Sequence, residues 1–266
     1  MKSLTDTHCH LNFPEFDADR IHLLDEFKLH GIQRILVPAV DINSSTQVMT
    51  LCHKYPDVLF PALGIHPNHS NHLQGNELDE LAGQISDPSV RAVGEVGLDF
   101  YRDWSPKDTQ ISVFSKMLDL ASEFKLPICI HNRKADDVLL PMLEDWVARL
   151  VANKSNLLAN PGVFHAFDGS PRVAKWAVTH HFKLGICGNI TYQNANQIRD
   201  TIKSIDIGHL LLETDSPYLT PEPKRGQRND PRNLILIAQT LSEVTGRALD
   251  DVIKITSINA AKLFKL

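Results

Sequence analysis

The chain has 266 residues, 42% of them hydrophobic, which is enough to bury a large core as one large domain or two ordinary ones. Its net charge of -5 excludes a broadly basic surface that coats nucleic acid, but not a local basic patch. No stretch approaches the roughly eighteen apolar residues of a membrane span, no basic and then apolar leader is visible, and the four cysteines form no CxxC pair, so we expect a soluble cytoplasmic protein with reduced thiols.

Short apolar runs recur along the chain, as is typical of strands that are buried on both faces of a parallel sheet. The first run ends in Asp-Thr-His-Cys-His at 6–10. The others cover 34–40, 58–66, 90–99, 126–131, 162–165, 183–190 and 209–215. Segments with apolar residues at helical spacing separate successive runs. These expected helices cover 17–30, 44–53, 78–85, 107–125, 135–151, 172–180 and 195–205, and two more, 231–245 and 249–264, follow the last run. The polar stretch 152–160 is expected to be a loop.

Eight strands that alternate with helices predict a parallel sheet. We therefore expect an α/β fold, a closed (β/α)8 TIM barrel, with an open doubly wound sheet as the alternative. Because no internal repeat, low-complexity tract or linker interrupts the pattern, residues 1–266 are expected to form a single domain. In such a barrel the active site lies at the C-terminal ends of the strands and is built from side chains of several of them.

Titratable side chains stand at the ends of most of the expected strands. His8 and His10 are two residues apart on an extended segment, so their imidazoles point to the same face. Further groups of this kind end later runs, namely His66, Glu95, Asp99, His131, His165 and Asp215. Buried apolar strands rarely end in such residues without a shared task, and the pattern predicts a metal site.

Six of these side chains are the expected metal ligands: His8, His10, Glu95, His131, His165 and Asp215. A single tetrahedral zinc ion needs fewer ligands, whereas a carboxylate from a middle strand can bridge two ions about 3.5–4 Å apart. Mixed imidazole and carboxylate ligands suit zinc, manganese or magnesium. The sequence therefore predicts two divalent metal ions, Mg²⁺, Mn²⁺ or Zn²⁺.

Three further acids lie close to these ligands in the sequence. Asp6 and Glu213 lie one step deeper on the same faces as His8 and Asp215, and Asp99 ends the same run as Glu95. They are expected to orient the ligands through hydrogen bonds. For Asp6 and Glu213, the alternative is a buried acid that pairs with a basic side chain.

Basic and aromatic residues follow the same strand ends. We expect Arg133, Arg225 and Arg228 to bind substrate phosphate, because guanidinium groups hold phosphate oxygens in bidentate fashion. His66 is also expected to bind the phosphate. A solvated charged loop, and for His66 an ordinary loop histidine, are the alternatives. Aromatic side chains also follow the fourth and eighth runs: Phe100, Tyr101, Trp104 and Tyr218. They either stack on the bases of a single strand or pack loops onto the barrel.

With these motifs the chain resembles the TatD family of metal-dependent deoxyribonucleases, within the amidohydrolase-like superfamily. The similar segments are Asp-Thr-His-Cys-His at 6–10, Gly-Ile-His-Pro at 64–67, Gly-Glu-Val-Gly-Leu-Asp at 94–99, Ile-His-Asn-Arg at 130–133, His-Ala-Phe-Asp-Gly at 165–169, Leu-Glu-Thr-Asp-Ser-Pro-Tyr at 212–218 and Arg-Asn-Asp-Pro at 228–231. They span nearly the whole chain. One residue departs from the family pattern, because Asp168 stands where the family usually has Ser or Thr.

The resemblance implies which residues hold each metal. His8, His10, Glu95 and Asp215 would hold one ion, and Glu95, His131 and His165 the other, with Glu95 as the bridge. It also implies hydrolysis of phosphodiester bonds in DNA, from a 3′ end. In such a reaction we expect Asp215 and Glu95 to be the catalytic residues, with Asp215 deprotonating or orienting the attacking water.

DNA, single-stranded or at its 3′ ends, is thus the expected partner, and neither a membrane nor an obligate protein partner is indicated. The alternatives are a hydrolase of a small amide, lactone or phosphoester on the same barrel, and a metal-binding protein without turnover.

Overall fold

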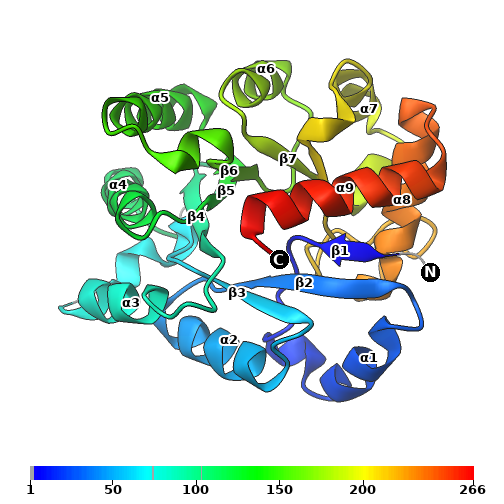
Figure 1. Cartoon of the computed structure of the whole chain (residues 1–266), viewed down its shortest axis with the longest axis horizontal. Helices are drawn as coiled ribbons and strands as arrows, with labels where there is room; N and C mark the ends of the chain where they lie inside the picture. Colours follow the sequence, from blue (N-terminus) through cyan, green and yellow to red (C-terminus); the bar gives the residue numbers. More distant parts are fainter. Residues whose placement is uncertain (1–2, 74, 103) are drawn as a thin grey trace.

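The computed structural model describes residues 3–73, 75–102 and 104–266 (Figure 1). Eight parallel strands form one sheet in chain order. They are β1 Leu4–Asp6, β2 Ile32–Pro38, β3 Leu59–Leu63, β4 Ala92–Asp99, β5 Ile128–Arg133, β6 Gly162–Phe164, β7 Lys183–Ile186 and β8 Leu210–Leu212. The backbone N–H of Thr7 donates to the carbonyl of Leu212 at 3.0 Å, which brings the two ends of the sheet together. The predicted TIM barrel is confirmed.

Helices connect successive strands and surround the sheet (Figure 1). They are α1 Arg20–Phe27, α2 Ile42–Lys54, α3 Glu77–Ile85, α4 Lys107–Phe124, α5 Asp136–Ala152, α6 Pro171–Thr179, α7 Asn196–Lys203, α8 Leu234–Thr245 and α9 Leu249–Phe264. None of these helices, within the ranges that the structure describes, is long and apolar enough to cross a bilayer.

Several predicted boundaries were too generous. The run 183–190 pairs in the sheet only as far as Ile186, and Gly188–Thr191 forms a 3-10 turn. Ile190 is nevertheless fully buried, so the apolar pattern there reports burial and not strand pairing. Likewise, β8 ends at Leu212, before the end of the expected run 209–215. Short 3-10 turns occupy Asn156–Ala159, within the expected loop, and Pro231–Asn233, where the first turn of a helix was expected.

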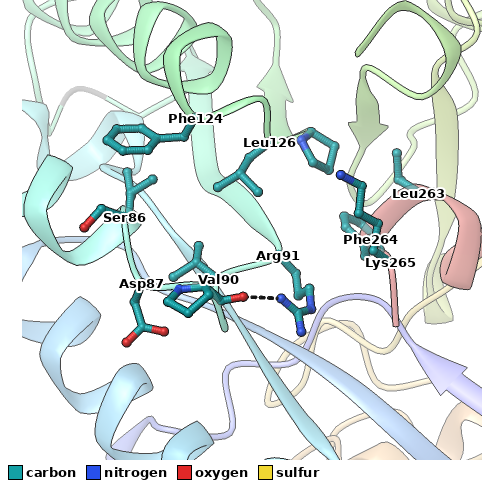
Figure 2. A pocket seen from close by; sticks show the side chains of 12 residues that line it. Ser86, Asp87, Val90, Arg91, Phe124, Leu126, Leu263, Phe264 and Lys265 are labelled. Atoms are coloured by element: carbon teal, nitrogen blue, oxygen red, sulfur yellow. Dashed lines mark hydrogen bonds between the residues drawn. The ribbon is translucent and has the colours of Figure 1, made fainter. Parts of the chain in front are cut away.

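The last helix closes one end of the barrel. Three side chains of α9, Ala260, Leu263 and Phe264, form a buried cluster with one apolar residue from each of six strands. A cavity of about 250 Å³ lies beside this contact, between the C-terminal end of α9 and the segments that lead into β4 and β5 (Figure 2). Arg91 lines it and donates to the carbonyl of Pro88 at 2.7 Å. This is the N-terminal end of the strands, so the functional end of the barrel is the opposite one.

Helix α2 begins with a complete capping box. The Asp41 carboxylate accepts from the backbone N–H of Ser44 at 2.7 Å, and the Ser44 hydroxyl accepts from the backbone N–H of Asp41 at 2.9 Å. The Asp41→Ala variant is expected to lose about 1 kcal/mol or somewhat more of the free energy of unfolding, because the backbone N–H of Ser44 loses its acceptor. Urea denaturation at neutral pH measures the change.

The pH dependence of this contribution follows from the same contacts. A hydrogen bond to His69 and the bonds from Ser44 hold the pKa of Asp41 well below its usual value. Since the pKa is lower in the folded state, the stabilisation is present above the unfolded pKa of about 4 and is lost as the pH falls through the folded value. The Asp41→Asn variant keeps a capping oxygen but loses the negative charge beside His69, so its stability at neutral pH should lie between those of Asp41→Ala and wild type. Equal stability of Asp41→Ala and wild type would contradict the assignment.

Candidate metal centre

Two segments that lie far apart in the sequence meet at the C-terminal edge of the barrel. Beyond β1 and β8 the chain continues side by side, because Asp215 N–H donates to the His8 carbonyl and His10 N–H donates to the Ser216 carbonyl, both at 2.8 Å. This pairing brings the Asp215 carboxylate within 3.9 Å of His8 Nε2 and 3.6 Å of His10 Nε2. Asp215 has a φ of +56°, in the left-handed region that favours glycine. A non-glycine residue in this conformation is itself a mark of a specialised position.

Glu95, at the centre of the site, approaches these histidines with one of its carboxylate oxygens. Its Oε2 lies 3.2 Å from His8 Nε2 and 3.5 Å from His10 Nε2, and those two nitrogens lie 3.3 Å apart. Ligands bound to one metal at about 2.0–2.2 Å in a tetrahedron are roughly 3.3–3.6 Å from one another. The three side chains therefore have the spacing of a coordination shell.

The other oxygen of Glu95 faces a different group of imidazoles. Its Oε1 lies 2.8 Å from His131 Nδ1, 3.5 Å from His66 Nε2 and 3.6 Å from His165 Nε2. His66, His131 and Glu95 offer three ligand atoms within 4.8 Å of one another, as do His8, His10 and Glu95. Glu95 thus stands between two candidate metal groups, with one oxygen toward each.

The charges of the site also favour a cation. Burial alone would lower the pKa of His165, but the carboxylates of Asp215, Glu213 and Glu95 outweigh it and raise that pKa to about 10. By contrast, burial and the nearby imidazole of His165 lower the pKa of His8 to about 4, so His8 has a free nitrogen lone pair for a metal. Positive charge at this point is stabilised, whether it is a proton on His165 or a metal ion.

Burial is the largest influence on the pKa values of Asp215 and Asp6. It raises the pKa of Asp215 to about 6 against the opposing effect of His165 and His10. It also raises the pKa of Asp6 to about 7, against hydrogen bonds from Thr214 and His8. Asp6 accepts from Thr214 N–H at 2.9 Å, from the Thr214 hydroxyl at 2.6 Å and from His8 N–H at 3.2 Å. It therefore ties β1 to the segment after β8 through backbone and hydroxyl groups, whereas the sequence suggested contact with an imidazole.

Glu213 makes the imidazole contact that the sequence considered. Its fully buried carboxylate lies 3.0 Å from His165 Nδ1, where an N–H can donate to it, and accepts from Ala166 N–H at 2.6 Å. This leaves His165 Nε2 directed at Glu95. A Cβ atom at Gly185 would lie 2.2 Å from the Glu213 carboxylate, so only glycine leaves room for it.

Asp99 connects the site to the segment that follows β4. Its Oδ2 lies 3.3 Å from His131 Nε2, and its Oδ1 accepts from the backbone N–H groups of Tyr101 and Arg102 at 3.0 and 3.1 Å. His131 is therefore held between Glu95 on one ring nitrogen and Asp99 on the other, the arrangement by which a carboxylate orients a metal-binding imidazole.

The residues expected to bind phosphate differ in their surroundings. Arg133 lies over the ring of Tyr101, 4.1 Å from its centroid, and the exposed Arg225 lies over Tyr192 at 4.2 Å. Arg228 lies over the Phe16 ring at 4.6 Å and in addition forms two hydrogen bonds with the Asp19 carboxylate, at 2.8 and 2.6 Å. That pairing joins the segment after β8 to the start of α1.

His66 and Asp168 lie in different surroundings. His66, expected to bind substrate phosphate, lies among the candidate ligands of the second group, and its Nδ1 accepts from Asn68 N–H at 3.1 Å. Its place at the end of the third apolar run, like the other histidines, was the available signal. Its role in phosphate binding stays a prediction. Asp168 is exposed and accepts from Ser170 N–H at 2.9 Å, so it shapes the turn before α6 and does not point among the ligands.

Comparison with known proteins identifies the family. The model for TatD related DNases matches residues 5–265. The chain belongs to the TatD family. The uncharacterized metal-dependent hydrolase YabD of Bacillus subtilis is 34% identical over 263 residues, which cover 99% of both chains. The crystal structure of the TatD homologue YjjV from Escherichia coli K12 superimposes with a TM-score of 0.90 at 30% identity and covers 99% of this chain and 98% of that one.

A third TatD relative carries a more specific name. The 3′-5′ ssDNA/RNA exonuclease TatD of Erwinia tasmaniensis is 29% identical over 266 residues, 98% of this chain and 99% of that protein. The family resemblance predicted from the motifs is thus confirmed, and the protein is a metal-dependent hydrolase of the TatD family.

Proposed function

We propose that this TatD-family hydrolase is a deoxyribonuclease that shortens single-stranded DNA from its 3′ end with two divalent metal ions. The observation that carries the proposal is the position of Glu95, whose two oxygens face separate groups of imidazoles. Two ions that share a carboxylate are suited to in-line displacement at phosphorus. The name of the Erwinia relative supports the choice of substrate.

The proposed ligand sets share Glu95. His8, His10, Glu95 and Asp215 would hold one ion, and Glu95, His131 and His165 the other, with His66 beside the second set. Bound there, a divalent ion supplies Lewis acidity and lowers the pKa of water.

The protein groups would supply the proton transfer and the positioning. The Asp215 carboxylate, 3.7 Å from His165 Nε2 and 3.6 Å from His10 Nε2, is at the right place to accept a proton from the attacking water. Arg133 ends β5 two residues after His131, and its guanidinium would position the scissile phosphate.

The decisive test is hydrolysis of DNA by protein that is stripped with EDTA and then reconstituted with Mg²⁺, Mn²⁺ or Zn²⁺. We expect no cleavage without metal, about two bound ions per chain by elemental analysis, and stepwise shortening of a 5′-labelled single strand from its 3′ end. A single strand with a blocked 3′ end is the matched control, and it should persist. Cleavage that continues in EDTA would contradict the proposal.

One observation favours a smaller substrate as the second candidate. Arg228 is engaged by Asp19, so one of the cations expected to bind a DNA strand is already paired. A small amide, lactone or phosphoester would not need it. Two bound ions, hydrolysis of a small ester such as bis(4-nitrophenyl) phosphate, and no cleavage of DNA would support this alternative.

We also propose that the chain acts as one domain in the cytoplasm. The support for one domain is that the family match spans 5–265 and that all eight strands belong to one sheet. The support for the compartment is that all four cysteines are buried free thiols.

A further inference from the structure

Exposed aromatic side chains are concentrated at the functional end of the barrel. Among the residues that the structure describes, three Phe, Tyr or Trp side chains are exposed: Tyr101 by 63%, Trp104 by 61% and Tyr218 by 51%. The first two follow β4 and the third follows β8. The other large exposed apolar side chains are aliphatic and lie on or next to the outer helices, for example Leu29. Trp104 therefore does not pack a loop onto the barrel, which was the alternative from the sequence.

An arginine guanidinium group lies over each of the two rings after β4. Arg102 lies over the Trp104 ring at 4.6 Å from its centroid, and Arg133 lies over the Tyr101 ring at 4.1 Å. Rings that present a large exposed area next to cations suit a ligand that is both flat and negatively charged. Nucleotides have both properties.

The backbone that bears the two rings is also bonded to residues beside the candidate metal ligands. Asp99 accepts from the backbone N–H of Tyr101 and, with its other oxygen, lies 3.3 Å from His131 Nε2. Beyond Trp104, the Ser105 hydroxyl donates to the carbonyl of Asn68, whose own N–H donates to His66 Nδ1. One carboxylate thus positions both a candidate ligand and the segment that carries the rings.

We propose that Tyr101 and Trp104 form a stacking platform for successive unpaired bases of the strand whose 3′ end lies at the metal centre. The platform rests on the proposed deoxyribonuclease function and adds the residues that select single strands. Bases in a duplex are already stacked on one another and cannot lie on these rings, whereas every unpaired base offers a face, so the platform is indifferent to sequence.

Steady-state kinetics on a single-stranded oligonucleotide tests the platform. Trp104→Ala is expected to raise KM about ten-fold, which is the contribution of stacking on one ring. Adding Tyr101→Ala to that variant should raise KM about ten-fold more. In Trp104→Ala kcat, and the hydrolysis of bis(4-nitrophenyl) phosphate, should stay unchanged, because the Trp104 ring contacts Arg102 and not Arg133. Trp104→Phe keeps a ring and should remain near wild type. Leu29→Ala, which removes an exposed apolar side chain elsewhere, is the matched control.

The outcomes separate the platform from the nuclease proposal. If wild type cleaves the single strand and the alanine variants keep its KM, the platform is wrong and the nuclease function stands; the exposed rings then suit a protein partner. If KM rises equally for blunt duplex and single strand, the rings do not select unpaired bases and the inference also fails. If wild type hydrolyses only the small diester, both proposals fall together.

Discussion

Glu95→Gln is expected to lower kcat on DNA by at least about a thousand-fold and to reduce the metal content of the purified protein. Glu95 faces His8 and His10 with one oxygen and His131 with the other, so both candidate metal groups lose their shared anion. A metal that acts as a Lewis acid supplies several kcal/mol to the transition state, and a loss of about 4 kcal/mol corresponds to roughly three orders of magnitude in rate.

Two measurements on the same preparation check this expectation. Elemental analysis gives the ions bound per chain, and single-strand hydrolysis at saturating substrate gives kcat. Asp168→Asn is the matched control, because it also neutralises an acid that follows a strand at this end of the barrel, but one that is exposed and bonded to Ser170. Full metal content together with wild-type kcat in Glu95→Gln would sink the idea of a shared carboxylate.

The architecture could be read from the chain because two simple regularities determine it. Short apolar runs that alternate with helical segments require a parallel sheet with both faces covered. The carboxyl ends of such strands meet at one edge, and for that reason His8, Glu95 and Asp215 could be expected to converge although they are far apart in sequence. In the structure the carboxylates of Glu95 and Asp215 both lie within 4 Å of His8 Nε2.

Contacts that depend on side-chain direction could not be predicted in this way. Residue parity places Asp6 and Glu213 on inward faces, but it does not say that Asp6 bonds to Thr214 while Glu213 reaches His165. The second contact also requires the space that Gly185 leaves on a neighbouring strand. Only the three-dimensional arrangement reveals that requirement.

The arginines expected to bind phosphate show the same limit at longer range. Arg228 belongs to a run of cations, and a run suggests a common role. In the structure Arg133, Arg225 and Arg228 all lie over aromatic rings, but Arg228 also binds the carboxylate of Asp19, which is 209 residues earlier. Since charge composition carries no information about such partners, sequence alone could name the cations but not which of them are already paired.

Asp215→Asn is expected to lower kcat on single-stranded DNA by about 10²- to 10⁴-fold, the usual contribution of a positioned proton acceptor. Asparagine has the same shape and can still offer an oxygen to a metal beside His10, but it cannot accept the proton of the attacking water. The metal content should therefore fall much less than in Glu95→Gln. The contrast between the two variants is the informative result, because Glu95 lies between both candidate metal groups whereas Asp215 borders His8, His10 and His165.

Stepwise cleavage of a labelled strand by wild type and Asp215→Asn, purified identically, measures the effect. Asp215→Glu separates the charge from its position: it restores the carboxylate but moves it by one methylene, so it should recover only part of the rate if placement matters. If Asp215→Asn lost both its metal and its activity, the loss of a ligand would account for the whole effect and the proton would need another acceptor. Equal cleavage by wild type and Asp215→Asn would point to a contaminating nuclease, because removal of the carboxylate that accepts the proton must slow the reaction.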